Sequence, residues 1–474
     1  MSPLPPNNPA PVPPAGADGI AAPPQARFLT GSTMRHVTVM SIAGALGLSF
    51  LFLIDFLAVL WVSQYDDESM IAAVGYAFTI QFFPASMNIG MMIATIALYA
   101  RALGGGYVDR ARRIATLGIL AGLAAQLLVS GLLWTFRDHI LTWTGASGAT
   151  LEMASDFLGI SLFGMPLMVV GMTMAGLVRA TGDAFRATLV TALAALVALV
   201  VDPFNILYLG MGVEGAGLSV VITRSVMCVL GAWFLLGVHN MAARPRWDDL
   251  RNYLLPWVAI AGPAVLTQCS TPFGNWVLMR AMAEYGDSAT AGLGVVLRLI
   301  VLVFGGIFAL SGAIGGILGQ NYGGGRMDRV AQAYKDALKF CAIYAIIAWG
   351  LLALLTEPLV AAFALTDEGA TVMRAFCWFV PPALIFTGAL FVANAAFNNL
   401  GRPLMATVAN WLRDGVVTFP LAVGLGVMFG ATGVLMGQAA AGVIVGIWGA
   451  WLGWRYVRRL RDDAVPVDGD PRAS

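Results

Sequence analysis

Charged side chains are scarce in this sequence. Only 11% of the 474 residues are charged, against about 25% in an ordinary soluble domain. The 27 Lys and Arg residues nearly balance the 26 Asp and Glu residues, and no basic block stands out. A soluble globular domain and a nucleic-acid-binding protein are therefore both disfavoured.

Cysteine and histidine are also rare. The four cysteines fall inside apolar runs at unrelated spacings and are expected to be small buried residues, not disulfides: Cys228, Cys269, Cys341 and Cys377. None of the three histidines has a cysteine or a second histidine at ligand spacing: His36, His139 and His239. No metal site and no organic cofactor are therefore predicted.

A phosphate-binding loop of the form G-x-x-x-x-G-K-[ST] is missing as well. This absence argues against an ATP-driven pump, so any transport has to be driven by an ion gradient. The connections between apolar runs are short and poor in acids and histidine. A membrane-embedded transferase is for that reason the less favoured alternative, and the chain is not expected to be an enzyme.

Long apolar runs are what the chain has in abundance. Hydrophobic residues make up 59% of the sequence, and a helix of about 20 residues crosses a bilayer core of about 30 Å. The runs are continuous, not alternating, which favours helices over a β-barrel. Twelve are expected, at 36–63, 70–99, 111–135, 153–178, 186–209, 214–238, 252–283, 290–317, 331–355, 372–396, 404–428 and 431–455. The predicted fold is an all-α polytopic membrane protein.

The chain is also an internal duplication. The motif Gly-Gly-Gly-x-x-Asp-Arg occurs at 104–110 and again at 323–329. The two copies are separated by 323 − 104 = 219 residues, and we call this separation the repeat offset. The same offset relates Ala72 to Ala291, Gly75 to Gly294 and Gly182 to Gly401. Four landmarks at one separation indicate two related units of six helices each. The glycines themselves are interpreted as sharp turns between successive helices.

Lysine and arginine are distributed unequally between alternate connections. One side has only Arg137, Arg280 and Arg374. The other side has twenty: Arg27, Arg35, Arg101, Arg110, Arg112, Arg113, Arg179, Arg186, Arg244, Arg246, Arg251, Arg326, Arg329, Lys335, Lys339, Arg402, Arg455, Arg458, Arg459 and Arg461. Positive residues collect on the cytoplasmic side. Both termini and both Gly-Gly-Gly turns are therefore predicted to be cytoplasmic, in a bacterial inner membrane.

These observations predict the domain organisation. Residues 1–34 are expected to be a disordered Pro- and Ala-rich cytoplasmic tail without a secretory signal. Six-helix bundles are placed at 35–238 and 252–456, joined by a linker at 239–251 and followed by a basic, then acidic tail at 457–474. Two like bundles that start on the same side and face each other favour a monomeric secondary transporter working by alternating access.

Several stretches resemble one transporter family. They are Ile54-Asp55-Phe56, the two glycine turns, Val178-Arg179-Ala180-Thr181-Gly182-Asp183, Asp202-Pro203, Gly212-Val213-Glu214-Gly215, Arg298 and Gly319-Gln320-Asn321. In order and spacing they look like the multidrug and toxic compound extrusion (MATE) transporters, over about residues 35–455. The resemblance implies a cation-coupled antiporter that expels bulky cationic or amphipathic organic molecules. Flippases and metabolite exporters of the same superfamily are the alternative, although they usually have 14 spans or a strongly basic cleft.

Asp55 and Asp202 are the predicted ion-coupling residues. Both belong to the outer half of the first bundle, where a carboxylate removed from water takes up a proton more readily. The competing interpretation is a structural role for Asp55, and for Asp202 a position facing water near a helix end. The asparagines that the family carries near this aspartate are replaced by Ala195 and Ala198, and Thr271 stands where its sodium-coupled branch has an acid. Proton coupling is therefore favoured, and a sodium site within the first lobe alone is the alternative.

The remaining intramembrane charges are Arg224, Arg298, Arg413 and Asp414. A pair between Arg413 and Asp414 is not expected, because adjacent residues on a helix point in different directions. Each charge is expected to pair structurally across helices, with substrate contact as the alternative. Residues suggested to line the substrate cleft are Phe52, Phe82, Met87, Gln268, Trp276, Phe391 and Asn394. For any one of them, packing or lipid contact is the competing interpretation.

Overall fold

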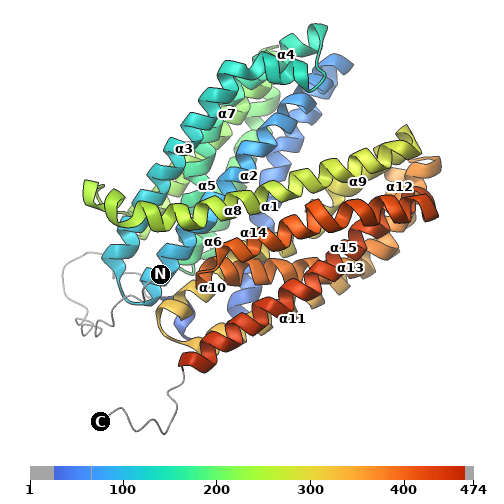
Figure 1. The fold of residues 1–474 in the computed structure, drawn as a ribbon. Helices are drawn as coiled ribbons and strands as arrows, with labels where there is room; N and C mark the ends of the chain where they lie inside the picture. The colour runs from blue at the N-terminus through green and yellow to red at the C-terminus, as the bar shows by residue number, and fades with distance from the viewer. Residues whose placement is uncertain (1–25, 66, 364, 465–474) are drawn as a thin grey trace, which may run out of the picture.

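A computed structural model describes residues 26–65, 67–363 and 365–464, and every regular element in these ranges is helical (Figure 1). The α-helices are α1 (Thr33–Val62), α2 (Glu68–Gly104), α3 (Val108–Trp143), α4 (Gly148–Ser161), α5 (Gly164–Ala180), α6 (Ala184–Pro203), α7 (Gly212–Ala232), α8 (Trp247–Met282), α9 (Asp287–Val303), α10 (Gly305–Gly323), α11 (Met327–Leu354), α12 (Thr356–Ala362), α13 (Asp367–Leu400), α14 (Pro403–Trp411) and α15 (Thr418–Ala464). Short 3-10 turns lie at Arg27–Leu29, Ser63–Tyr65 and Ala283–Tyr285, and π-helical turns at Phe204–Tyr208, Trp233–Val238 and Leu412–Val417.

The twelve predicted spans are confirmed, two of them in bent form. Within the described ranges, nine helices are long and apolar enough to cross a membrane, and two further pairs, α4 with α5 and α9 with α10, do so with a bend of 45°. The last of the nine runs from Pro403 to Ala464. It is two helices joined at Gly430, where φ is 65° and the helical backbone is interrupted. Counted as two spans, it raises the nine helices to ten, and the two bent pairs bring the total to twelve spans.

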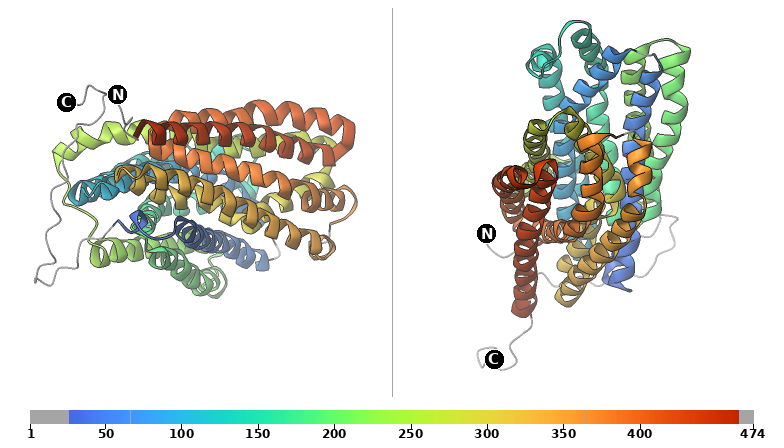
Figure 2. Two further views of the ribbon diagram at one scale, coloured as in Figure 1. Left: turned by 90° about the horizontal axis from the view of Figure 1, so that it is seen from below. Right: turned by 90° about the vertical axis from the view of Figure 1, so that its right-hand side faces the viewer.

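The helices form two lobes, one from α1 to α7 and one from α8 to α15. We call the end of the molecule that carries Ala26, Ala464 and both Gly-Gly-Gly turns the terminal face, and the opposite end the far face. The lobes lie close together near the terminal face and diverge toward the far face (Figure 1). Seen from below, they form two layers (Figure 2).

The first helix of each lobe begins against the other lobe. Val37 and Met40 of α1 belong to the apolar core of the second lobe, and Trp257 of α8 belongs to that of the first. The later parts return to their own lobes, where Leu57 and Leu278 are buried. Two crossing helices therefore join the lobes over the half nearest the terminal face.

The two lobes also touch at the Gly-Gly-Gly turns. A Cβ atom on Gly104 would overlap the carbonyl group of Gln320, and a Cβ atom on Gly323 would overlap the carbonyl group of Arg101. The interpretation of these glycines as turns is correct locally but incomplete. They also let the ends of α2 and α10 cross at backbone contact, which no larger residue allows.

Ordered structure extends past two of the predicted boundaries. Residues 26–34, placed by sequence in the N-terminal tail, include a 3-10 turn and the start of α1. At the other end α15 continues beyond residue 456 to Ala464. Its last turns carry the pairs Arg458–Asp462 and Arg459–Asp463 at 3.7 and 3.8 Å, a spacing of four residues that supports a helix. The rest of the predicted tails lies outside the described residues.

Candidate functional site

Asp202 is buried inside the first lobe. It lies in the last turn of α6, close to the far face, and is only 2% exposed. The interpretation that it faces water is therefore wrong. Next to it the main-chain oxygen of Val201 accepts a hydrogen bond from Ser219 of α7, and Asn205 donates to the same hydroxyl at 3.1 Å. Ala195 and Ala198, also buried on α6, add no polar group.

A chain of buried polar side chains runs through the same half of the first lobe. Gln81 of α2 donates to the hydroxyl of Ser161 at 2.6 Å and accepts from Arg224 of α7 at 3.3 Å. Arg224 also packs at the bend between α4 and α5, where a Cβ atom on Gly164 would lie 2.9 Å from its Cδ. Neither Asp202 nor Arg224 is isolated. Sequence reasoning missed Gln81, although a glutamine inside an apolar run was an available signal.

Asp55 lies on α1, which packs against α6. The placement of its side chain lies outside what the structure describes. A meeting of the two carboxylates of Asp55 and Asp202 therefore stays a prediction.

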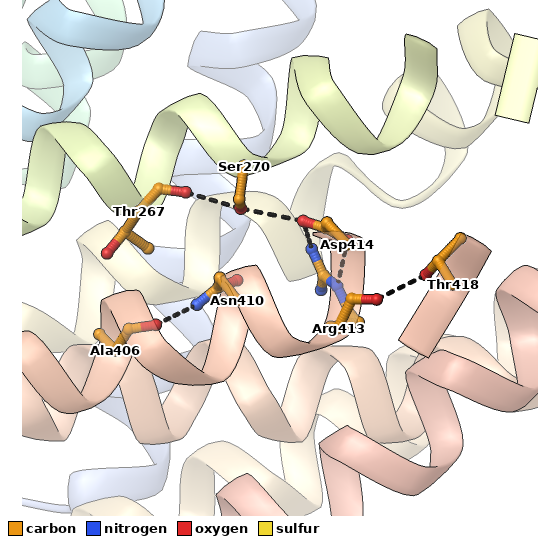
Figure 3. Close-up of polar contacts among 7 residues, drawn as sticks. All are labelled: Thr267, Ser270, Ala406, Asn410, Arg413, Asp414 and Thr418. Atoms are coloured by element: carbon orange, nitrogen blue, oxygen red, sulfur yellow. Dashed lines mark hydrogen bonds and ion pairs between the residues drawn. The ribbon is translucent and has the colours of Figure 1, made fainter. Parts of the chain in front are cut away.

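The second lobe holds a buried ion pair (Figure 3). Arg413 donates from Nε to Asp414 Oδ1 at 2.7 Å and from Nη2 to Oδ2 at 2.9 Å. Both residues are buried, with exposures of 7% and 8%. The prediction that these two side chains do not pair is wrong. They sit in the π-helical turn Leu412–Val417, whose wider coil brings successive side chains closer in direction than a regular α-helix does.

This ion pair also reaches across to α8, as expected for Asp414. Ser270 donates to Asp414 Oδ2 at 2.9 Å. Gly274, one turn later, lies so near that a Cβ atom would be 3.0 Å from the Cβ of Asp414. The guanidinium of Arg413 lies over the ring of Phe391, 5.6 Å from its centroid. Among the described residues its Nη1 has no hydrogen-bond partner.

Comparison with known proteins places this geometry in a family. The family model MatE matches residues 44–204 and again residues 263–423. The two matches begin one repeat offset apart, 263 − 44 = 219, and so coincide with the internal duplication. The chain belongs to the MATE family. It is a membrane transporter of that family, as the sequence resemblance predicted.

Relatives of this MATE transporter cover most of its length. A FAD transporter of Shewanella oneidensis is 25% identical over 426 residues, 89% of this chain and 94% of the relative. The multidrug export protein MepA of Staphylococcus aureus is 24% identical over 413 residues, 85% of this chain and 88% of the relative. Among solved structures, the Vibrio cholerae MATE transporter VcmN in its bent form superposes with a TM-score of 0.84 at 20% identity, covering 91% of this chain and 98% of that one.

The residues suggested for the substrate cleft of this MATE transporter differ in exposure. Phe52 on α1, Phe82 on α2 and Trp276 on α8 are exposed, whereas Met87 and Gln268 are half-buried. Phe391 of α13 packs between Arg413 of the π-helical turn and Phe308 of α10. Asn394 is buried, and its Oδ1 has no partner among the described residues. Their role as a substrate surface stays a prediction.

Arg298 and Thr271 complete the predicted set. Arg298 is exposed on α9, and within the described ranges its guanidinium makes no hydrogen bond or ion pair, so the expected structural partner is not found there. Thr271 is half-buried on α8, directly after the Ser270 that contacts Asp414. In the part of the chain that the structure describes, no three His, Cys, Asp or Glu side chains come together as metal ligands.

Proposed function

We propose that this MATE transporter is a proton-coupled antiporter that exports bulky amphipathic or cationic organic compounds. It acts as a monomer in a bacterial inner membrane, with the terminal face in the cytoplasm. No organic cofactor takes part, and a proton gradient supplies the energy. The observation that carries the proposal is Asp202, an acid buried in the outer half of a lobe that has to move.

Such an acid can couple a proton to the movement of the lobes. A proton shifts a two-state equilibrium only by the difference between its affinities for the two states. Each tenfold difference in affinity is worth about 1.4 kcal/mol. A difference of two or three powers of ten, within the range found for buried carboxylates, therefore changes which state dominates. The kinship with the multidrug export protein MepA supports a drug-like cargo.

Sodium is the less favoured coupling ion. Thr271 carries no charge at the place where the sodium-coupled branch has an acid, and Asp414, the intramembrane acid predicted on the second lobe, is already paired with Arg413. A cation site there would have to displace the guanidinium. The first lobe, with Asp55 and Asp202, is therefore the favoured place for ion coupling.

Efflux of a fluorescent dye from proteoliposomes with an imposed proton gradient tests the proposal. Asp55→Asn is expected to abolish gradient-driven efflux, and Asp202→Asn to weaken it less because Ala195 and Ala198 stand where the family has asparagines. Asp109→Asn is the matched control, since that carboxylate is 90% exposed at the start of α3. A protonophore should stop transport by the wild type. Wild-type rates in both Asp55→Asn and Asp202→Asn would refute proton coupling through the first lobe.

An anionic metabolite is the second candidate cargo. The kinship with a FAD transporter favours it, and so do two arginines: Arg298 is exposed, and Nη1 of Arg413 has no partner among the described residues. Two cations on the second lobe would suit a phosphate or carboxylate group. Competition decides between the candidates. FAD that inhibits dye efflux in the wild type but not in Arg298→Gln would favour the anionic cargo.

The proposed orientation rests on the distribution of positive charge, twenty Lys and Arg residues against three. A reporter enzyme fused to the C-terminus should be active in its cytoplasmic form. Activity of a periplasm-only reporter at that position would overturn the orientation.

A further inference from the structure

The contact between the lobes at the terminal face follows the internal repeat. Arg101 at the end of α2 donates from Nε to the main-chain oxygen of Asn399 on α13, at 2.7 Å. Gln320 at the end of α10 donates from Nε2 to the main-chain oxygen of Ala180 on α5, at 2.7 Å. Arg101 and Gln320 are related by the repeat offset, and so are Ala180 and Asn399. Each lobe thus binds the last turn of a helix in the other, and together these bonds close the terminal face.

One short segment lies across this junction on one side only. We call residues 26–31 the N-terminal latch. The main-chain nitrogen of Phe28 donates to Oε1 of Gln320 at 3.1 Å. Gln320 therefore uses one end of its amide for the other lobe and the other end for the latch. Because Gln320 is fully buried, losing the latch leaves a buried acceptor without its partner.

The side chains of the latch pack where the lobes meet. The ring of Phe28 is 1% exposed. A Cβ atom added to Gly316 of α10 would lie 3.4 Å from that ring and 3.2 Å from the Cα of Ala180 of α5, so ring, α5 and α10 converge at one point. Arg27 packs against Gly182 in the turn that follows α5. The latch therefore contacts both lobes.

Arg329 of α11 holds the latch in place. Its guanidinium donates to three main-chain oxygens of the latch, those of Phe28, Thr30 and Gly31, at 3.0, 3.2 and 3.0 Å. Nε donates to Asn321 at 3.0 Å, and Asn321 in turn donates to the oxygen of Phe28 at 3.2 Å. An arginine keeps its charge at any physiological pH, so the bonds that its guanidinium donates are charge-assisted.

The repeat does not supply a second latch. Arg110 is the counterpart of Arg329 at the repeat offset, and it lies over the ring of Tyr253, 5.7 Å from its centroid. The counterpart of Phe28 is Trp247, which is 86% exposed. Duplication alone therefore explains the closed junction but not the latch, which is an addition to one half.

We propose that the N-terminal latch locks the terminal face closed, and that it has to leave the junction between Gln320 and Ala180 before the lobes can part there. This inference goes beyond the proposed function, because it concerns the opening of one face and holds for any cargo or coupling ion. It makes Arg329 a positioning residue for the closed state.

Hydrogen–deuterium exchange of the full-length protein in lipid nanodiscs tests the latch. Arg329→Gln removes the charge that holds it, and Arg110→Gln is the matched control at the repeat position. In Arg329→Gln, peptides that cover the last turns of α5 and α10 should exchange faster by about tenfold or more, the shift that the loss of one charged hydrogen bond gives. In Arg110→Gln the same peptides should exchange at the wild-type rate.

A second variant keeps the test decisive if Arg329→Gln folds poorly. Arg329→Lys retains the charge but cannot bridge three oxygens with one planar group, so an intermediate acceleration is expected. If the latch peptide exchanges faster in either variant while the ends of α5 and α10 keep the wild-type rate, residues 26–31 are only a packed tail and the proposal is refuted.

Discussion

The buried pair of Arg413 and Asp414 allows a test in which each single substitution lowers folding stability and the two together do not. Asp414→Asn keeps the shape of the side chain but leaves the guanidinium of Arg413, a residue only 7% exposed, without a counter-charge. Leaving one member of a buried pair alone costs about 3–5 kcal/mol of folding free energy. Arg413→Met should cost a similar amount, because it leaves the buried carboxylate of Asp414 without its counter-charge, held by the hydrogen bond from Ser270.

Removing both charges should restore stability. The double variant Arg413→Met/Asp414→Leu fills the same space with apolar atoms, and replacing a buried pair in this way is commonly neutral or stabilising by about 1–4 kcal/mol. Equilibrium unfolding in detergent, read as a double-mutant cycle, measures the coupling between the two sites. The exposed pair of Arg374 and Glu357, with donor and acceptor 2.8 Å apart, is the control. Breaking it should leave stability nearly unchanged.

The double variant also separates a structural role from contact with cargo. If it is as unstable as the single variants, the cost does not come from an unpaired buried charge and the reasoning fails. If it is stable and transports normally, the pair only holds α8 against the π-helical turn Leu412–Val417. If it is stable and does not transport, Arg413 contacts the cargo.

Three further predictions follow from single sites. Gly104→Ala should disfavour closure of the terminal face and reduce transport, because the new Cβ atom would overlap the backbone of Gln320. Gly75→Ala on the same helix is the control and should transport normally, because its new Cβ atom would meet no heavy atom within 4 Å. Thr271→Ala should keep ion coupling in the vesicle assay, since nothing ionisable is lost; a folded but uncoupled variant would contradict this. Burial lowers the pKa of His239 below 6.5, although the carboxylate of Asp183, 3.2 Å away, acts to raise it. The contribution of neutral His239 to folding stability is therefore present above about pH 6.5 and is lost as the pH falls through the lowered pKa. His239→Gln should therefore flatten the acid limb of a plot of stability against pH, and an unchanged limb would count against the assignment.

Much of the fold could be predicted because it depends on long-range averages of composition. About 20 apolar residues span a bilayer whatever their order, and a repeat at one constant offset survives many local changes. The bends at Phe163 and Phe304 could not be predicted in the same way. The bend at Phe163 lies where the side chain of Arg224, from another helix, packs against Gly164. Such a contact leaves no local mark in the sequence.

The candidate site was predicted less well, for a related reason. The rule that adjacent side chains diverge holds for a regular α-helix, and the π-helical turn around Arg413 and Asp414 breaks it. The N-terminal latch was assigned to a tail because it follows a Pro- and Ala-rich stretch, yet its order comes from main-chain oxygens bound by Arg329. A single phenylalanine after a proline-rich stretch, Phe28, was the only local sign of it.

Comparison of the two repeats shows how the duplicated lobes have come to differ in charge. At the repeat offset, Asp414 is the counterpart of Ala195 on α6, while the counterpart of Asp202 is Leu421. On these corresponding segments the two buried acids Asp202 and Asp414 therefore lie at different depths. The acid of the second lobe is bound by Arg413 at two atoms and is committed to that pair. An ion site at Asp414 would require both bonds from Arg413 to break, so the division of the acids itself favours ion coupling through the first lobe.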